Sequence, residues 1–167
     1  MCELIKRVAS EGVDNNEPQL LEECFTPQFT TRRKYRGEWR DMQKLLLPGY
    51  VIAVTSRPEE LALRMRKVPQ FTLLLSMGET FVPLRKDECL WMEEFTEDGD
   101  RTVALSIAVK YGDSITVTDG PLKGREGIIK KINRHKCLAY LEVSIGGKRV
   151  TTTVGLAVLP KEECSEA

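Results

Sequence analysis

Residues 112–132 have the sequence GDSITVTDGPLKGREGIIKKI, and the rest of the chain can be interpreted from this segment. Ile115 and Val117 alternate with polar residues, which is typical of a half-buried β-strand. Asp119-Gly120-Pro121 then interrupts the strand, because glycine tolerates positive φ and proline keeps its neighbour out of the helical region. The apolar pair Ile128-Ile129 resumes the pattern. The segment therefore predicts a strand, a glycine-rich turn and a second strand.

The overall composition fits a folded protein of one or two small domains and predicts no partner by itself. The chain has 167 residues, of which 41% are hydrophobic and 30% are charged, and its formal net charge is zero. The charges are unevenly distributed, because residues 110–161 contain ten lysines and arginines but only four acidic residues. The C-terminal part is therefore locally basic.

The five cysteines indicate neither a disulfide framework nor a zinc site, because their number is odd and no C-x-x-C motif occurs. Reduced thiols fit a cytosolic protein. No apolar run approaches the roughly 18 residues that would span a membrane, and the N-terminal residues lack a signal-peptide pattern. The sequence thus predicts a cytoplasmic protein without metal, cofactor or membrane partner.

The first hundred residues contain both helix and strand signals. Residues 2–11 have helical periodicity, residues 29–45 resemble a hairpin, and the apolar run over 50–54 predicts a central strand. Ser56 and Glu59 have the spacing of a capping box for a helix over 58–67. A further helix carries Trp91 and Phe95 on one face.

After residue 110 only strand patterns occur. Residues 137–145 alternate, Gly146-Gly147 predicts a hairpin turn, and residues 150–154 and 156–159 predict two further strands. About five short strands in some fifty residues fit a small barrel with a thin core. The fold class is therefore α+β. We predict a mixed first domain over residues 1–97, a linker over 98–109 and a barrel over 110–161.

The predicted hairpin carries cations with interleaved aromatic residues. One interpretation is a solvated hairpin whose aromatic rings stabilise cross-strand pairs. The other is a ribbon that faces nucleic acid, because cations suit phosphates and aromatic rings suit exposed bases. The candidate residues are Arg32, Arg33, Lys34, Arg36, Trp39 and Arg40.

A second basic set follows the glycine-rich segment at the end of a strand and in the turn after it. A turn lifts its side chains clear of a barrel, so several cations can meet one phosphate-lined groove. Arginine can bind phosphate or a guanine edge in bidentate fashion, whereas lysine acts as a point charge. The alternative is a solvated turn that lends solubility. The candidate residues are Lys130, Lys131, Arg134, His135 and Lys136.

Enzymatic activity is not predicted. His135 is the only histidine, and neither serine nor cysteine with a supporting acid lies near it in the sequence. Cys137 falls on the apolar face of its strand, which indicates a core residue. The sequence also lacks a P-loop, a G-x-G-x-x-G motif and an H-E-x-x-H motif.

Two segments resemble motifs of the NusG family. Residues 112–129 closely resemble the KOW motif of NusG-type transcription elongation factors and of some ribosomal proteins, and Leu47-Pro48-Gly49-Tyr50-Val51 resembles the F-P-G-Y-V run of the NusG amino-terminal domain. The resemblance implies an α/β sandwich, called the NGN domain, followed by an SH3-like KOW barrel. It also implies a monomeric bacterial factor that binds the clamp of RNA polymerase, with non-template DNA as a further candidate partner. Leu47, Pro48, Gly49 and Tyr50 are the implied polymerase contacts, although the family has an aromatic residue where this chain has Leu47.

Three departures from the family pattern refine this expectation. The chain starts inside the family's first helix, so either the sequence is short at its amino terminus or the NGN domain lacks its first strand. Ile145-Gly146-Gly147 has no phenylalanine where the general factor contacts Rho or a ribosomal protein, so neither partner is implied. The basic residues of 130–136 and the run Cys24-Phe25-Thr26-Pro27-Gln28 are similar to LoaP, a specialised paralogue.

The similarity to LoaP implies processive antitermination of particular operons, with an RNA hairpin recognised by the KOW domain. Two alternatives remain open. One is a housekeeping NusG-type factor for elongation and termination. The other is a ribosome-associated KOW protein that binds RNA and ignores polymerase.

Overall fold

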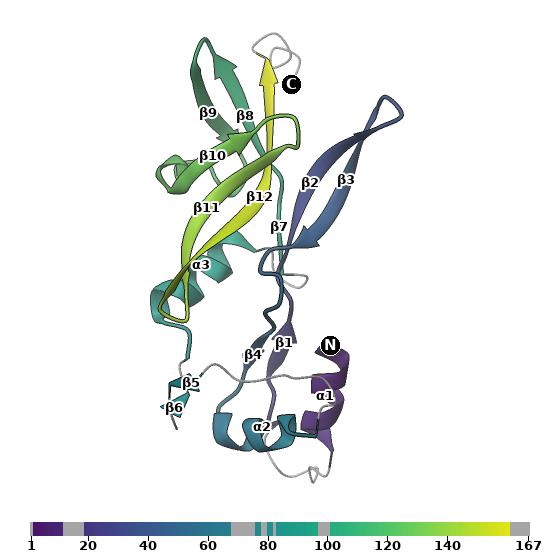
Figure 1. The fold of residues 1–167 in the computed structure, drawn as a ribbon, viewed down its shortest axis with the longest axis vertical. Coiled ribbons are helices and arrows are strands. Elements are labelled where there is room, and N and C mark those ends of the chain that lie inside the picture. Colours follow the sequence, from purple (N-terminus) through teal and green to yellow (C-terminus); the bar gives the residue numbers. More distant parts are fainter. Residues whose placement is uncertain are drawn as a thin grey trace. The chain divides into compact units, whose positions relative to one another are not determined.

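The computed structural model of the chain describes residues 2–11, 19–67, 76–77, 80–81, 83–96 and 101–160 (Figure 1). These residues combine helices with many strands, which confirms the predicted α+β class. The chain divides into two compact units. The first unit comprises Met1–Thr26 and Gly49–Pro83, and the second comprises Pro27–Pro48 and Leu84–Ala167.

The first unit is small and mixed. Its elements are α1 (Cys2–Ser10), β1 (Glu23–Phe25), β4 (Ile52–Val54), α2 (Pro58–Met65), β5 (Ser76–Met77) and β6 (Thr80–Phe81). Ile5 and Val8 on α1 pack with Leu61 and Met65 on α2, so the helix predicted over 2–11 is confirmed together with its apolar face. Leu20 and Cys24 complete this core.

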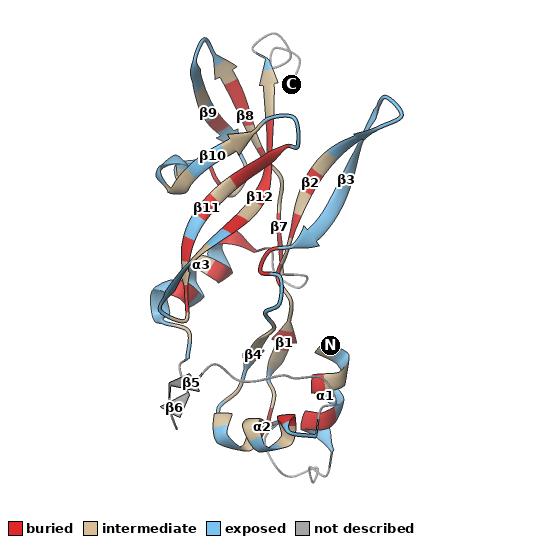
Figure 2. Ribbon diagram, in the orientation of Figure 1, coloured by how far each residue is buried: buried red, intermediate tan, exposed pale blue. Residues whose placement is uncertain are grey.

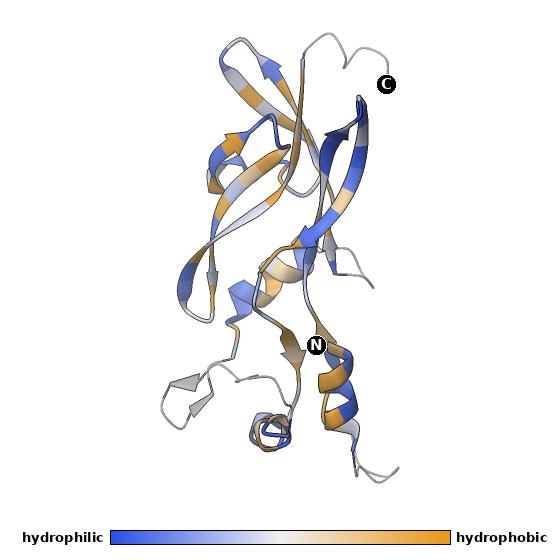
Figure 3. Ribbon diagram, turned by 45° about the vertical axis from the view of Figure 1, so that its right-hand side comes forward, coloured by the Kyte–Doolittle hydropathy of each residue, from blue (hydrophilic) through white to orange (hydrophobic). Residues whose placement is uncertain are grey.

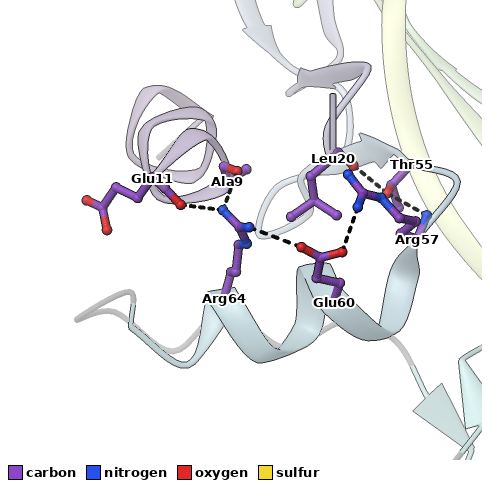
Figure 4. Close-up of polar contacts among 7 residues, drawn as sticks. All are labelled: Ala9, Glu11, Leu20, Thr55, Arg57, Glu60 and Arg64. Carbon is purple, nitrogen blue, oxygen red and sulfur yellow. Dashed lines mark hydrogen bonds and ion pairs between the residues drawn. The ribbon is translucent and has the colours of Figure 1, made fainter. Parts of the chain in front are cut away.

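Polar contacts tie α2 to the segments around it (Figure 4). The Arg64 guanidinium donates to the Ala9 carbonyl at 3.0 Å and pairs with Glu60 at 3.0 Å. The predicted capping box of Ser56 and Glu59 is wrong, because α2 begins at Pro58 and its N-cap residue is Arg57. Proline occupies the first helical position, so Ser56 lies one residue too early to cap the helix.

The apolar run over 50–54 predicts a central strand, and this prediction is wrong for the described residues. There β4 pairs only with β1, with Cys24 opposite Ala53. Val54 is 39% exposed, and the other two residues of β4 are half-buried. A short apolar run shows that a segment is hydrophobic but does not show how many neighbours it has.

The second unit contains a five-stranded sheet with the order β10-β11-β12-β8-β9. These strands are β8 (Ser106–Tyr111), β9 (Ser114–Asp119), β10 (Ile129–Asn133), β11 (Leu138–Ile145) and β12 (Lys148–Pro160), and a short helix η1 (Glu126–Ile128) precedes β10. A small β structure in the C-terminal region is thus confirmed. The two strands predicted over 150–154 and 156–159 are one strand, β12, and the fifth strand is β8, which begins inside the predicted linker.

The turn after β9 explains the glycine-rich segment. Gly120 has φ of +89°, and a Cβ placed there would lie 2.6 Å from the Ser106 Cα on β8. The Ser106 hydroxyl oxygen accepts a hydrogen bond from the Leu122 backbone N–H at 3.1 Å. Because neither the backbone angle nor the space allows a side chain, this position requires glycine.

The hairpin and the third helix also belong to the second unit. The hairpin is confirmed as β2 (Gln28–Tyr35) and β3 (Glu38–Leu45), and β7 (Thr102–Val103) extends it as a parallel neighbour of β2. On α3 (Lys86–Phe95), the rings of Trp91 and Phe95 stack with centroids 5.3 Å apart. The Arg125 guanidinium lies 4.9 Å from the Phe95 ring and pairs with Glu94, so it joins the glycine-rich segment to α3.

The division of the chain into domains at residues 97 and 110 stays a prediction. The hairpin and α3 belong to the same compact unit as the C-terminal strands, β7 lies within the predicted linker, and β8 begins inside it. None of the described helices is long and apolar enough to cross a membrane.

Candidate nucleic-acid interface

The β2–β3 hairpin holds the first basic set on exposed antiparallel strands. Its register runs from Gln28 opposite Leu45 to Tyr35 opposite Glu38. Every residue of β3 is exposed, whereas β2 buries Phe29 and Thr31. Figure 2 shows that the half of the hairpin nearer its turn is exposed, and Figure 3 shows that this half is largely hydrophilic.

The register sorts the hairpin residues into two faces, because side chains alternate along a strand and opposite residues share a face. We call the face with the buried Phe29 and Thr31 the inner face. The inner face consists of Phe29, Thr31, Arg33, Tyr35, Glu38, Arg40, Met42 and Lys44, and the outer face consists of Gln28, Thr30, Arg32, Lys34, Trp39, Asp41, Gln43 and Leu45.

On the outer face, the two cations have local partners. The Arg32 Nε lies 2.7 Å from an Asp41 carboxylate oxygen, and the Lys34 ammonium lies 6.0 Å from the centroid of the Trp39 ring. Because an aromatic ring attracts an ammonium group, this contact agrees with the first interpretation, in which the ring stabilises a cross-strand pair.

On the inner face, two cations oppose each other. Arg33 lies directly opposite Arg40, an arrangement of like charges that destabilises a hairpin. Arg40 has one acidic neighbour, Glu38, at 3.6 Å, and both side chains are largely exposed. The guanidinium groups of Arg36 and Arg40 lie 5.4 and 5.3 Å from the Tyr35 ring.

Three residues of the second basic set form an exposed turn between β10 and β11. We call Arg134, His135 and Lys136 the basic turn. The Asn133 side-chain oxygen accepts a hydrogen bond from the Lys136 N–H at 3.1 Å, and the Cys137 N–H donates to the Arg134 carbonyl at 3.3 Å. These bonds fix the backbone from which the three side chains project.

The remaining two residues of that set, Lys130 and Lys131, lie on β10 and are exposed. The pairing register of β10 with β11 shifts between Ile129 and Lys131. The Lys131 ammonium lies 6.0 Å from the ring centroid of Tyr140, its partner across the strands. The structure therefore places these lysines beside the basic turn along the chain but not on it.

The structure brings the hairpin and the basic turn together. The Thr31 hydroxyl on the inner face donates to the Cys137 carbonyl at 2.9 Å, and Thr31 is 2% exposed. One residue earlier, the Thr30 carbonyl passes so close to β12 that a Cβ on Gly155 would lie 1.9 Å from its oxygen. Strand β2 thus crosses β12 at Gly155, and the inner face adjoins the basic turn.

The cysteine beside the basic turn is a core residue. Cys137 is 5% exposed, and burial raises the pKa of its thiol, while the nearby Arg32 lowers it in part. A raised pKa reduces the thiolate fraction, so Cys137 is not an activated nucleophile. Among the described residues, no three His, Cys, Asp or Glu side chains are grouped closely enough to hold a metal ion.

The residues implied for the polymerase contact differ in their exposure. Leu47, in the second unit, is 2% exposed. Pro48 and Gly49 are exposed, and Tyr50, in the first unit, is 43% exposed. Pro48, Gly49 and Tyr50 are therefore accessible, whereas Leu47 is a core residue in this structure.

Sequence reasoning missed the residues that hold the hairpin against the barrel. Thr31 has the pattern of an ordinary strand residue, and nothing local connects it to Cys137, from which it is separated by 106 positions. Gly155 offered one signal, because a glycine inside an apolar run indicates a close backbone approach.

Comparisons with known proteins bear on this interface. The KOW motif matches residues 112–145, a segment that contains β9, β10, β11 and the basic turn. The chain is also similar to proteins named transcription termination/antitermination protein NusG. The Rickettsia felis protein is 23% identical over 146 residues, covering 87% of this chain and 74% of the relative.

Two other relatives with the same name match over similar lengths. The Rickettsia bellii protein is 22% identical over 160 residues, covering 95% of this chain and 83% of the relative. The Campylobacter jejuni protein is 25% identical over 146 residues, covering 86% of this chain and 81% of the relative. The identity is low, but the similarity extends well beyond the KOW segment on its N-terminal side.

Proposed function

We propose that this chain is a NusG-family factor that binds RNA polymerase and promotes processive antitermination of particular operons. It does so by binding rather than by chemistry. The first contact is with polymerase, and the second is with an RNA hairpin in the nascent transcript. The observation that carries the RNA part is the exposed basic turn inside the matched KOW segment.

The basic turn suits a structured RNA. Arg134 can bind a phosphate or a guanine edge through two parallel N–H groups, and Lys136 adds a point charge beside it. Proteins recognise RNA hairpins through backbone shape and unstacked loop bases, which a projecting turn can reach more easily than a flat sheet can. Hydrogen bonds of Asn133 and Thr31 with the backbone of the turn and of the residue after it reduce the backbone entropy that binding would cost.

The RNA contact is tested with Arg134→Ala combined with Lys136→Ala in the full chain. The probe is a labelled RNA hairpin from the leader of the operon that carries the gene. We expect Kd to rise about thirtyfold, or ~2 kcal/mol, because hydrogen bonds to charged groups contribute about 1.5–3 kcal/mol each. The slope of log K against log salt should also fall by about 0.7–0.9 per lost phosphate contact.

The matched control is Lys148→Ala combined with Arg149→Ala. This pair removes the same formal charge at the other end of β11, where the Gly146-Gly147 turn leads into β12. The affinity of this control variant for the RNA hairpin should change by less than about threefold, because salt screens charges that lie far from the bound RNA. If both double variants lost the same affinity for the RNA hairpin, RNA binding would depend on net charge and not on the basic turn. That result would favour the housekeeping alternative.

For the polymerase contact, we propose that Tyr50 supplies the apolar group, with Pro48 and Gly49 beside it. Tyr50→Ala should weaken binding to purified RNA polymerase about tenfold or more, because aromatic residues dominate protein interfaces. Tyr50→Phe should retain most of the affinity. The control is Leu63→Ala, since Leu63 is a 60% exposed apolar residue of the same unit. Wild-type polymerase affinity in Tyr50→Ala would locate the interface elsewhere.

The same polymerase measurement separates the two remaining alternatives. A ribosome-associated KOW protein would bind ribosomal RNA and would not be retained by immobilised polymerase. A housekeeping factor would be retained but would not discriminate between the leader hairpin and an unrelated hairpin of equal length. Retention by polymerase together with discrimination between hairpins is the result that the proposed function requires.

A further inference from the structure

The inner face of the hairpin carries an arrangement of charges that folding does not favour. Arg33 and Arg40 face each other across the strands, and opposite like charges destabilise an antiparallel pair. The same two strands place Arg32 against Asp41 on the outer face, so opposite charges are paired there. An anion on the inner face would convert the unfavourable Arg33–Arg40 pair into a binding site.

The inner face adjoins a second group of cations. The Thr31 hydroxyl donates to the carbonyl of Cys137, the residue directly after the basic turn. Arg33 lies two residues beyond Thr31 on β2 and therefore on the same inner face. The combined surface has Arg33 and Arg40 on the inner face, Arg36 in the turn of the hairpin, and Arg134 and Lys136 on the basic turn. Against these five cations, the inner face has one acidic residue, Glu38.

From this juxtaposition we propose that one structured RNA binds the inner face of the hairpin and the basic turn at the same time. The inference rests on the proposed RNA contact of the basic turn and extends it to a second element of the chain. The basic turn holds phosphates of the stem. Arg33 and Arg40 bind the next phosphates along the RNA strand, and the Tyr35 ring stacks on an unpaired base of the loop.

The dimensions fit a single stem-loop. At about 3.3 Å per residue, Arg33 lies about 7 Å and Tyr35 about 13 Å along β2 from Thr31. This span is well below one turn of a nucleic-acid duplex, which is about 34 Å for B-form DNA. One stem-loop can therefore reach from the basic turn to the tip of the hairpin.

Tyr35 has the surroundings of a base-stacking residue. It is 51% exposed, and the guanidinium groups of Arg36 and Arg40 lie 5.4 and 5.3 Å from its ring. Aromatic rings and guanidinium planes both stack on splayed bases, and RNA loops present such bases whereas regular duplexes do not. This is why the chemistry favours RNA with an unpaired loop over duplex DNA.

The test compares two charge-matched double variants of the full chain with the leader RNA hairpin. Arg33→Ala with Arg40→Ala alters the inner face, and Arg32→Ala with Lys34→Ala alters the outer face. Each removes two cations and leaves one acidic neighbour, Glu38 or Asp41, without its arginine. We expect Kd to rise about tenfold or more for the inner-face variant, and less than about threefold for the outer-face variant.

A third variant tests whether the two elements act as one surface. Thr31→Val keeps the shape and charge of the strand but removes the hydroxyl that contacts the Cys137 carbonyl. It should weaken RNA binding, and Thr31→Ser should restore it. When Thr31→Val is combined with Arg33→Ala, Kd for the RNA hairpin should rise by less than the product of the two separate increases. The reason is that both substitutions disrupt the same bound arrangement.

The outcomes separate this inference from the proposed function. If the inner-face variant binds like wild type while Arg134→Ala with Lys136→Ala is weakened, RNA contacts the turn alone and the combined surface is refuted. If all these variants bind like wild type, the proposed RNA contact fails as well. Equal losses on both hairpin faces, or equal affinity for a DNA duplex with the sequence of the stem, would also overturn the inference.

Discussion

Leu47→Asp is expected to unfold the second unit rather than to weaken a surface contact. Leu47 is 2% exposed. The backbone of its neighbour Leu46 is hydrogen-bonded on both sides: its N–H donates to the Pro27 carbonyl at 2.8 Å, and its carbonyl accepts from the Thr152 hydroxyl. A carboxylate at this position would be buried without a partner. We expect the free energy of unfolding to fall by about 4 kcal/mol or more, measured by urea denaturation.

The control for this substitution is two residues away. Leu45 is 46% exposed at the end of β3, so Leu45→Asp introduces the same charge two residues earlier in the chain, in contact with water. Its effect on stability should stay within about 0.5 kcal/mol. Similar losses in the two variants would mean that Leu47 is not a core residue.

This result also bears on the polymerase interface. Lost polymerase binding in Leu47→Asp would follow from unfolding and would say nothing about contact. Leu47→Met is informative instead, because a volume-conserving core substitution costs less than about 1.5 kcal/mol and leaves the surface unchanged. It should bind polymerase like wild type, whereas Tyr50→Ala should not.

Glu88→Ala is expected to release α3 from the turn between β11 and β12. Glu88 is 2% exposed, and its carboxylate accepts hydrogen bonds from the Ser144 hydroxyl at 2.8 Å and from the Gly146 and Gly147 N–H groups at 3.1 Å. The Arg85 N–H donates to it at 2.9 Å. Because the substitution leaves these donors without an acceptor, we expect a loss of about 3 kcal/mol.

Hydrogen exchange provides the most direct readout for Glu88→Ala. The amides of α3 and those of Gly146 and Gly147 should exchange faster, while amides of the first unit should be unaffected. Glu93→Ala is the matched control, because Glu93 is an exposed acid on the same helix. Unchanged exchange at Gly146 and Gly147 would contradict the role of Glu88 in holding the turn.

The same contact makes stability depend on pH. Burial alone raises the pKa of Glu88, but its hydrogen bonds with Arg85, Gly147, Ser144 and Gly146 outweigh burial and hold the pKa below its ordinary value. A depressed folded-state pKa means that the unfolded chain binds the proton first. The stabilisation is therefore complete above about pH 4.3, the ordinary value for glutamate, and is lost as pH falls through the folded-state pKa.

Glu88→Gln isolates this pH dependence. Glutamine has nearly the same shape but cannot ionise in this range, so the acid-side loss of stability should be smaller in the variant than in wild type. The comparison is made by urea denaturation at several pH values between about 3 and 7, a range that brackets the ordinary pKa. Identical acid profiles for the two proteins would assign the pH dependence to other carboxylates.

Local elements were predictable because their causes are local. The alternation of Ile115 and Val117, the break at Gly120-Pro121 and the turn at Gly146-Gly147 are all present in the structure as expected. The α1 helix and the hairpin follow in the same way from periodicity. One local prediction failed, the capping box at Ser56, because α2 begins at Pro58 with Arg57 as its N-cap residue. The other failures concern neighbours, such as the number of strands beside β4 and the continuity of β12 through Gly155.

The two basic sets themselves were visible in the sequence, since a run of cations needs no fold to be recognised. Their adjacency was not visible, because Thr31 and Cys137 are separated by 106 positions and meet only where β2 crosses β12. The burial of Leu47 and the contacts of Glu88 were likewise invisible, as one belongs to an apolar motif and the other to an acidic run. Such contacts depend on which distant segments pack together, and tertiary packing alone determines that.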